Sequence, residues 1–136
     1  MSKTAVVYWS QTGNTETMAN AVAEAAGAEL ITASDFSADK VNEFDAIAFG
    51  CPAMGAEVLE EDEFQPMWDA VKANLSGKNI ALFGSYGWGD GEWMRNWEED
   101  AKSAGVNLIA EPVIANEAPD DEALAACKAL GEALAK

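Results

Sequence analysis

Apolar and polar positions divide the chain into two alternating kinds of segment. Five short, mainly apolar runs are rich in residues that favour strands, and turn-forming residues bound them. The run from Ala46 to Gly50 is apolar throughout, as expected for a central strand that is covered on both faces. We predict strands at residues 5–9, 29–32, 46–50, 79–84 and 107–114.

Between these runs, apolar residues return at the three- and four-residue spacing of a helix. Residues 14–26 form one such segment, and Gly27 is expected to close it in a left-handed conformation. Residues 33–45 show only weak helical periodicity. The other predicted helices are 64–75, with Pro66 near its start, 92–104, and a last one that opens with the acidic residues 120–122.

Strands that alternate with helices predict an α/β fold, in which right-handed crossovers join parallel strands and helices cover both faces of the sheet. A length of 136 residues fits a single domain over residues 1–136. In open sheets of this kind, ligands bind beyond the carboxyl ends of the strands. The loops after the first, third and fourth predicted strands therefore form the candidate site.

The loop after the first strand carries the groups of a phosphate-binding site. It offers hydroxyls on Ser10, Thr12 and Thr15 and an amide on Asn14, and Gly13 permits a tight turn before a helix start. It contains no Lys or Arg, and the absent P-loop pattern disfavours nucleoside triphosphate hydrolysis. A simple helix cap by Thr12 or Asn14 is the alternative interpretation.

The other two loops offer surfaces for a flat ligand. After the third strand, Met54 presents a polarisable sulfur, Gly55 a freely turning backbone and Glu57 an acceptor for a ring N–H. After the fourth strand, four glycines surround Trp88, which belongs to no helical stripe and is suited to stacking. An ordinary turn and a buried loop anchor are the respective alternatives.

Composition narrows the range of partners. Eight basic residues against 24 acidic ones give a net charge of −16, which repels nucleic acid and anionic lipid. The same charge favours basic partner surfaces, although acidity also serves solubility alone. No stretch approaches the roughly 18–20 apolar residues of a membrane span, and no secretory signal pattern precedes the first strand. We expect a cytoplasmic protein.

The residue types that usually carry catalysis are scarce. Two cysteines, Cys51 and Cys127, stand without a CxxC pattern, which argues against a zinc or iron–sulfur site. The chain has no histidine, the usual general base. Its chemistry is therefore expected to come from a bound cofactor.

Three segments, YWSQTGNT, GCPAMGAEVLE and ALFGSYGWGDGEWM, resemble the corresponding loops of short-chain flavodoxins. The similarity extends over essentially the whole chain, including the EAPD turn before the last helix, and an uninterrupted fifth strand resembles the short-chain class. The resemblance implies a flavodoxin-like, doubly wound five-stranded parallel sheet of order 2-1-3-4-5. It also implies noncovalently bound FMN in an electron-transfer protein that is not an enzyme.

The resemblance assigns roles position by position. The loop from Ser10 to Thr15 would hold the phosphate, Trp88 and Met54 would enclose the flavin ring, and Glu57 would meet the ring N3–H. The backbone at 87–89 would meet the pyrimidine edge, while Ser85 and Asn116 would reach the ribityl chain. The expected FMN-binding residues are Trp9, Ser10, Gln11, Thr12, Gly13, Asn14, Thr15, Pro52, Ala53, Met54, Gly55, Ala56, Glu57, Ser85, Tyr86, Gly87, Trp88, Gly89, Asp90 and Asn116.

The implied function is that of a low-potential one-electron carrier that cycles mainly between FMN semiquinone and hydroquinone. A phosphate loop without cations, Glu57 and the charge of −16 all oppose additional negative charge on the flavin. In the family, reduction flips the peptide after the residue at Gly55. A left-handed backbone at Ala56 would cost roughly 1 kcal/mol, so this residue is expected to weaken the semiquinone.

The expected partners are redox proteins with basic docking surfaces, namely oxidoreductases normally served by ferredoxin, and the carrier is expected to be a monomer. The acidic run at residues 60–63 is interpreted either as part of a docking face or as the solvated start of a helix.

Two other functions are weighed against this one. An FMN-dependent quinone or nitro reductase of the same fold is the leading alternative, but no added segment suggests a substrate or NAD(P)H pocket. A receiver-type signalling module would need acidic residues where the chain has Ser10-Gln11 and Cys51-Pro52.

Overall fold

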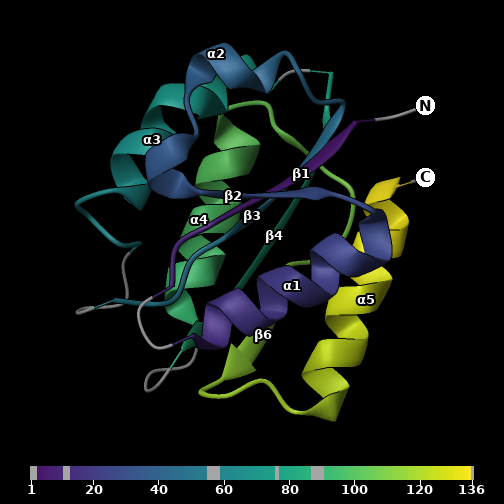
Figure 1. The fold of residues 1–136 in the computed structure, drawn as a ribbon. Coiled ribbons are helices and arrows are strands. Elements are labelled where there is room, and N and C mark those ends of the chain that lie inside the picture. The colour runs from purple at the N-terminus through teal and green to yellow at the C-terminus, as the bar shows by residue number, and fades with distance from the viewer. Residues whose placement is uncertain (1–2, 11–12, 55–58, 76, 87–90, 136) are drawn as a thin grey trace.

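A parallel sheet lies between two layers of helices (Figure 1). The structure is a computed structural model that describes residues 3–10, 13–54, 59–75, 77–86 and 91–135. Its strands run in the order β2-β1-β3-β4-β5, and β6 also pairs with β4. The predicted α/β class, parallel pairing and strand order are confirmed.

The element bounds follow the predicted pattern closely. The strands are β1 (Thr4–Tyr8), β2 (Glu29–Thr32), β3 (Ala46–Gly50), β4 (Asn79–Tyr86), β5 (Asn107–Leu108) and β6 (Val113–Asn116). The α-helices are α1 (Asn14–Ala26), α2 (Ala38–Val41), α3 (Phe64–Val71), α4 (Glu92–Ser103) and α5 (Asp121–Ala135). Short 3₁₀ turns at Ala33–Asp35 and Lys72–Asn74 complete the described elements.

The predicted fifth strand is divided in two, so the expectation of an uninterrupted strand over 107–114 is wrong. β5 pairs with the first residues of β4, and β6 pairs with its last four. Pro112 lies between the two pieces and has no N–H to donate to the ladder. The chain can therefore rejoin the sheet only after this residue.

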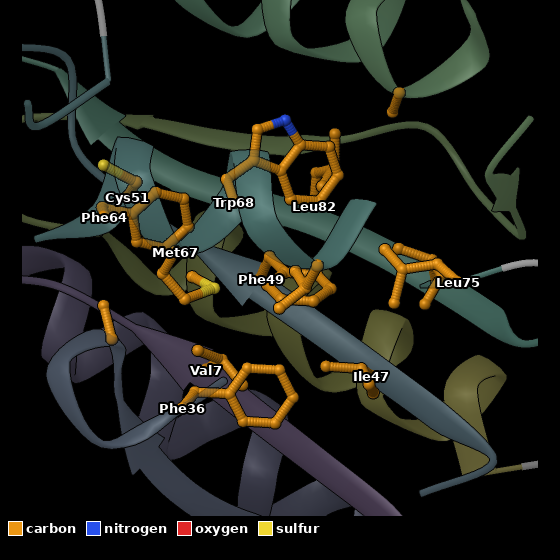
Figure 2. Packing of buried hydrophobic residues seen from close by; sticks show 14 of the residues in the cluster. Val7, Phe36, Ile47, Phe49, Cys51, Phe64, Met67, Trp68, Leu75 and Leu82 are labelled. Atoms are coloured by element: carbon orange, nitrogen blue, oxygen red, sulfur yellow. The ribbon is translucent and has the colours of Figure 1, made fainter. Parts of the chain in front are cut away.

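Each face of the sheet has its own buried core. On one face, α2, α3 and α4 pack large side chains against β1, β3 and β4 (Figures 1 and 2). Phe49 of β3 meets Trp68 of α3 edge to face, at 5.3 Å between ring centroids. On the other face, α1 and α5 lie side by side and bury smaller residues such as Val22 and Cys127. This division follows from the alternation of side chains along each strand.

The C-terminus of α1 has the glycine cap that the sequence predicts. Gly27 closes α1 with a φ of 65°, as predicted, and its N–H donates to the carbonyl oxygen of Ala23.

Within the described ranges, no helix has the length and apolar content needed to cross a membrane.

Candidate functional site

The carboxyl ends of the central strands are tied together by backbone hydrogen bonds. The N–H of Trp9 donates to the oxygen of Gly50 at 3.0 Å, which joins the ends of β1 and β3. The N–H of Ala53 donates to the oxygen of Ser85 at 2.9 Å, which joins the loop after β3 to β4. The three loops singled out from the sequence therefore start at one edge of the sheet.

A buried hydroxyl pair connects the first and third of these loops. Thr15 in the first turn of α1 and Ser85 near the end of β4 place their Oγ atoms 2.8 Å apart. The residues are 1% and 4% exposed, so each hydroxyl depends on the other for a partner. The predicted site residues Thr15 and Ser85, 70 positions apart in the sequence, are thus in direct contact.

Replacing Thr15 by valine tests this contact. Thr15→Val keeps the shape of the side chain but leaves the Ser85 hydroxyl buried without its partner, so we expect a loss of about 1–2 kcal/mol in the free energy of unfolding. Urea denaturation measures the loss. The matched control, Thr32→Val on the exposed β2, should change stability by less than about 0.5 kcal/mol. Equal effects of the two variants would contradict the assignment.

The start of α1 directs backbone N–H groups at a single oxygen. Ser10 Oγ accepts hydrogen bonds from the N–H of Gly13 at 3.1 Å and from the N–H of Glu16 at 3.2 Å. Gly13 holds the cap position with a φ of 96°, a conformation that favours glycine. Asn14 is the first residue of the helix, so a cap by Asn14 is wrong, and Ser10 supplies the acceptor instead.

This set of groups fits the phosphate of a flavin nucleotide. The N-terminus of α1 favours an anion, and the Ser10 hydroxyl, which already accepts from the N–H groups of Gly13 and Glu16, keeps its own O–H to donate. In its described part the loop contains no Lys or Arg. Groups of this kind can hold a phosphate without a cation, which leaves the surroundings electronegative.

Trp9, one of the expected FMN-binding residues, lies beside this loop. With Ser10, Gly13 and Glu16 it lines a hollow of about 330 Å³, and its indole N–H donates to Glu63 at 3.4 Å. In the same hollow, burial and then the charge of Glu16 raise the pKa of Tyr8 above its ordinary value.

The remaining described site residues lie at the same edge. Pro52, Ala53 and Met54 follow β3 and are half-buried. The ring of Tyr86 packs on that of Trp93 at 5.5 Å between centroids. Asn116, at the end of β6, pairs in register with Tyr86.

Nine of the predicted FMN-binding residues lie outside the described residues, and their roles stay predictions. They are Gln11, Thr12, Gly55, Ala56, Glu57, Gly87, Trp88, Gly89 and Asp90.

Sequence reasoning missed the role of Glu60. Glu60 belongs to the acidic run at residues 60–63, but it is only 6% exposed. Its carboxylate accepts hydrogen bonds from the N–H groups of Asp62, Glu63 and Phe64 at 2.7–2.8 Å. Glu60 therefore holds the start of α3 and cannot serve a docking face. An acidic residue shortly before a helix start was the available signal.

The two cysteines are structural in the described chain. Both are free and buried, and burial raises the pKa of the Cys51 thiol above its usual range and that of Cys127 to about 11. Such thiols stay protonated and unreactive at neutral pH. Among the described residues no group of acidic, histidine or cysteine side chains is arranged to hold a metal ion.

Comparison with known proteins agrees with this geometry. The family model described as flavodoxin matches residues 6–131. The flavodoxin of Megasphaera elsdenii is 46% identical over 136 aligned residues, covering 96% of this chain and 97% of its own. That of Clostridium beijerinckii is also 46% identical, covering 85% and 88%.

A solved structure gives the same result for the fold. The solution structure of two-electron reduced Megasphaera elsdenii flavodoxin superposes with a TM-score of 0.88 at 43% identity, covering 97% of this chain and 98% of that one. The family model, the two relatives and this structure show that the chain belongs to the flavodoxin family, whose members carry a flavin and transfer electrons rather than act as enzymes.

Proposed function

We propose that this protein binds FMN noncovalently and carries single electrons at low potential, moving mainly between the half-reduced and fully reduced flavin. The observation that supports it most directly is the N-terminus of α1, where hydroxyls and backbone amides meet in a loop whose described part has no Lys or Arg. FMN carries a terminal phosphate that these groups can hold, and its flavin ring supplies the electron chemistry when bound.

The protein's own contribution is to position the cofactor and to set its electrostatics. The Ser10 hydroxyl and the N-terminus of α1 would hold the phosphate, with Thr15 in the first turn of that helix fixed by its bond to Ser85. Glu16 and Glu63 near this loop, together with the net charge of −16, oppose further negative charge. Because 59 mV of a one-electron couple corresponds to about 1.4 kcal/mol, a few such repulsions lower the second potential appreciably.

Anaerobic photoreduction of the FMN-loaded protein, followed by visible spectroscopy, tests the proposal. We expect a blue, half-reduced species to accumulate before full reduction. Direct passage to the fully reduced flavin, or rapid turnover of NAD(P)H by the protein alone, would instead favour a two-electron reductase. FMN that does not remain bound through gel filtration would contradict the cofactor assignment.

We also propose that redox partners dock on this acidic protein through basic surfaces of their own. The protein would work as a monomer in the cytoplasm. Glu61, Asp62 and Glu63 remain exposed at the start of α3, next to the site, after Glu60 is turned inward. These three carboxylates add to a negatively charged surface, which attracts basic proteins.

The salt dependence of electron transfer checks the docking proposal. We expect the rate of reduction by a basic partner protein to fall several-fold between low salt and about 0.5 M, because screening shortens the range of attraction. A neutral small-molecule reductant serves as the control and should show little change. A flat response with the basic partner would contradict electrostatic docking.

A further inference from the structure

An open hollow lies beside β6, between this strand and the start of α5 (Figure 1). Its volume is about 320 Å³. Four alanines and Ile114 form its apolar part, and Asn116, Asp120 and Glu122 form its polar part. β6 pairs with β4 on one side, and among the described residues no strand pairs with its other side. The hollow therefore lies at an open edge of the sheet, where another molecule can reach it.

Ile114 exposes a large apolar side chain at this hollow. It is 39% exposed, and the one other large apolar side chain exposed among the described residues is Leu30 on β2, at 43%. The neighbouring Ala115 is buried against α5, so the alternation along β6 turns Ile114 to the opposite face. A single exposed apolar side chain is common on protein surfaces, so its surroundings decide whether it has a role.

The β6 hollow adjoins the expected flavin site. Asn116, which lines the hollow, is one of the expected FMN-binding residues and pairs in register with Tyr86 at the end of β4. The Cδ1 atom of Ile114 lies beside Gly91 at the start of α4, 3.2 Å from the position that a Cβ atom would take there. A molecule that covers Ile114 is therefore close to the flavin. Leu30 lies on β2, at the opposite edge of the sheet.

The rim of the β6 hollow is acidic. Asp120 and Glu122 line it, and Glu117 and Asp121 are exposed in the same stretch of chain. The carboxylate of Asp120 accepts a backbone N–H from the first turn of α5 at 2.8 Å, which fixes its position. Among the described residues no Lys or Arg lines the hollow, and the guanidinium of Arg95 comes near the start of α4 instead. Such a rim attracts basic groups.

We propose that the β6 hollow is a docking site for a basic redox protein, which places an apolar side chain against Ile114 while its Lys and Arg residues meet the acidic rim. The proposal rests on the proposed electron-carrier function and names where the partner binds. Burial of Ile114 adds an attraction that salt does not screen, whereas the charged contacts weaken with salt. A second copy of this chain is disfavoured, because it would bring another surface of a protein with a net charge of −16 against the rim.

Electron transfer at high salt isolates the apolar contact. The probe is cytochrome c, a basic haem protein, and in the reaction the reduced flavin loses one electron that the ferric haem gains. Ile114→Thr keeps a β-branched residue in the strand, and we expect it to lower the second-order rate constant about three- to five-fold at about 0.5 M salt. Leu30→Thr, the matched change at the opposite edge, should stay within about 1.5-fold of the parent. FMN content and the rate with a neutral small-molecule oxidant should be unchanged in both variants.

A charge-neutralising variant tests the acidic rim. We expect Glu122→Gln to slow the reaction with cytochrome c about two-fold at low salt and to have no effect at about 0.5 M salt. Glu24→Gln, an exposed glutamate of α1, is the matched control and should slow the low-salt reaction less. Equal effects of the two variants would contradict the assignment of the rim.

Methyl NMR detects docking without electron transfer. The chain has five isoleucines, and the δ1-methyl resonance that is lost in Ile114→Thr belongs to Ile114. Ferrous cytochrome c does not reduce the oxidised flavin, so the two proteins can be mixed without reaction. We expect a saturable shift of the Ile114 methyl and little change at Ile47, which is fully buried in β3.

Several results would overturn the proposal. They include equal rates for Ile114→Thr and Leu30→Thr at high salt, and no saturable shift of the Ile114 methyl. Loss of FMN from Ile114→Thr would show that Ile114 supports the cofactor instead. Concentration-dependent gel filtration that Ile114→Thr abolishes would show that a second copy covers this face. Because the methyl shift needs no electron transfer, failure of the electron-carrier function would remain distinguishable from failure of this docking site.

Discussion

Gly84→Ala is expected to lower the free energy of unfolding by about 3 kcal/mol or more. A Cβ atom at this position in β4 would overlap the carbonyl oxygen of Cys51 and would also lie 3.1 Å from the ring of Trp93. That carbonyl cannot move freely, because it accepts the indole N–H of Trp93 while the N–H of Cys51 donates to Phe83. Adding one methyl group therefore forces apart the ends of β3 and β4.

The site should weaken together with the fold. Ala53 in the loop after β3 donates its backbone N–H to Ser85 near the end of β4, and this bond joins two of the segments assigned to the flavin. We expect Gly84→Ala to lose much of its FMN affinity, measured by fluorescence titration, in addition to its stability in urea.

Gly105→Ala is the matched control for Gly84→Ala. Gly105 has a φ of 81° and open space around its missing Cβ, so its replacement should cost only about 1 kcal/mol of backbone strain. If Gly84→Ala cost no more than Gly105→Ala, the close approach of the two strand ends would not be the reason for glycine at position 84.

Elements that repeat an apolar pattern over several residues could be predicted from the sequence. Elements in which a single residue overrides the apolar pattern were predicted wrongly. The apolar run at Ala46–Gly50 and the helical stripe of α1 are repeated signals, and both elements form as expected. The division between β5 and β6 depends on the missing N–H of Pro112, which an apolar pattern does not register.

The candidate site shows the same contrast. That the three loops start at one edge of the sheet followed from the rule that ligands bind at the carboxyl ends of parallel strands, and the contact between Thr15 and Ser85 agrees with it. The role of Gly84 could not be predicted, because it depends on the carbonyl oxygen of Cys51, an atom from another segment that lies close to the position of the missing Cβ.

Glu60 provides the second large expected effect. Glu60→Ala would leave the N–H groups of Asp62, Glu63 and Phe64 without their acceptor at a helix start, and Phe64 is fully buried. We expect a loss of about 3 kcal/mol in the free energy of unfolding, because hydrogen bonds to a charged acceptor are worth more than neutral ones. Glu61→Ala, an exposed neighbour, is the control and should stay within about 0.5 kcal/mol of the parent.

The pH dependence of the unfolding free energy tests whether the negative charge of Glu60 is the source of this stabilisation. Burial raises the pKa of Glu60, but the hydrogen bonds from Phe64, Glu63 and Asp62 outweigh it and hold the pKa below its ordinary value. A carboxylate whose pKa is lowered on folding adds stability above the pKa of the unfolded chain, about 4.3, and this stability is lost as the pH falls through the folded pKa. The difference in unfolding free energy between the parent and Glu60→Gln should therefore be constant above about pH 5 and shrink below about pH 4. A difference that grows on acidification would show that Glu60 is bound in its protonated form, and the account of the helix start would then be wrong.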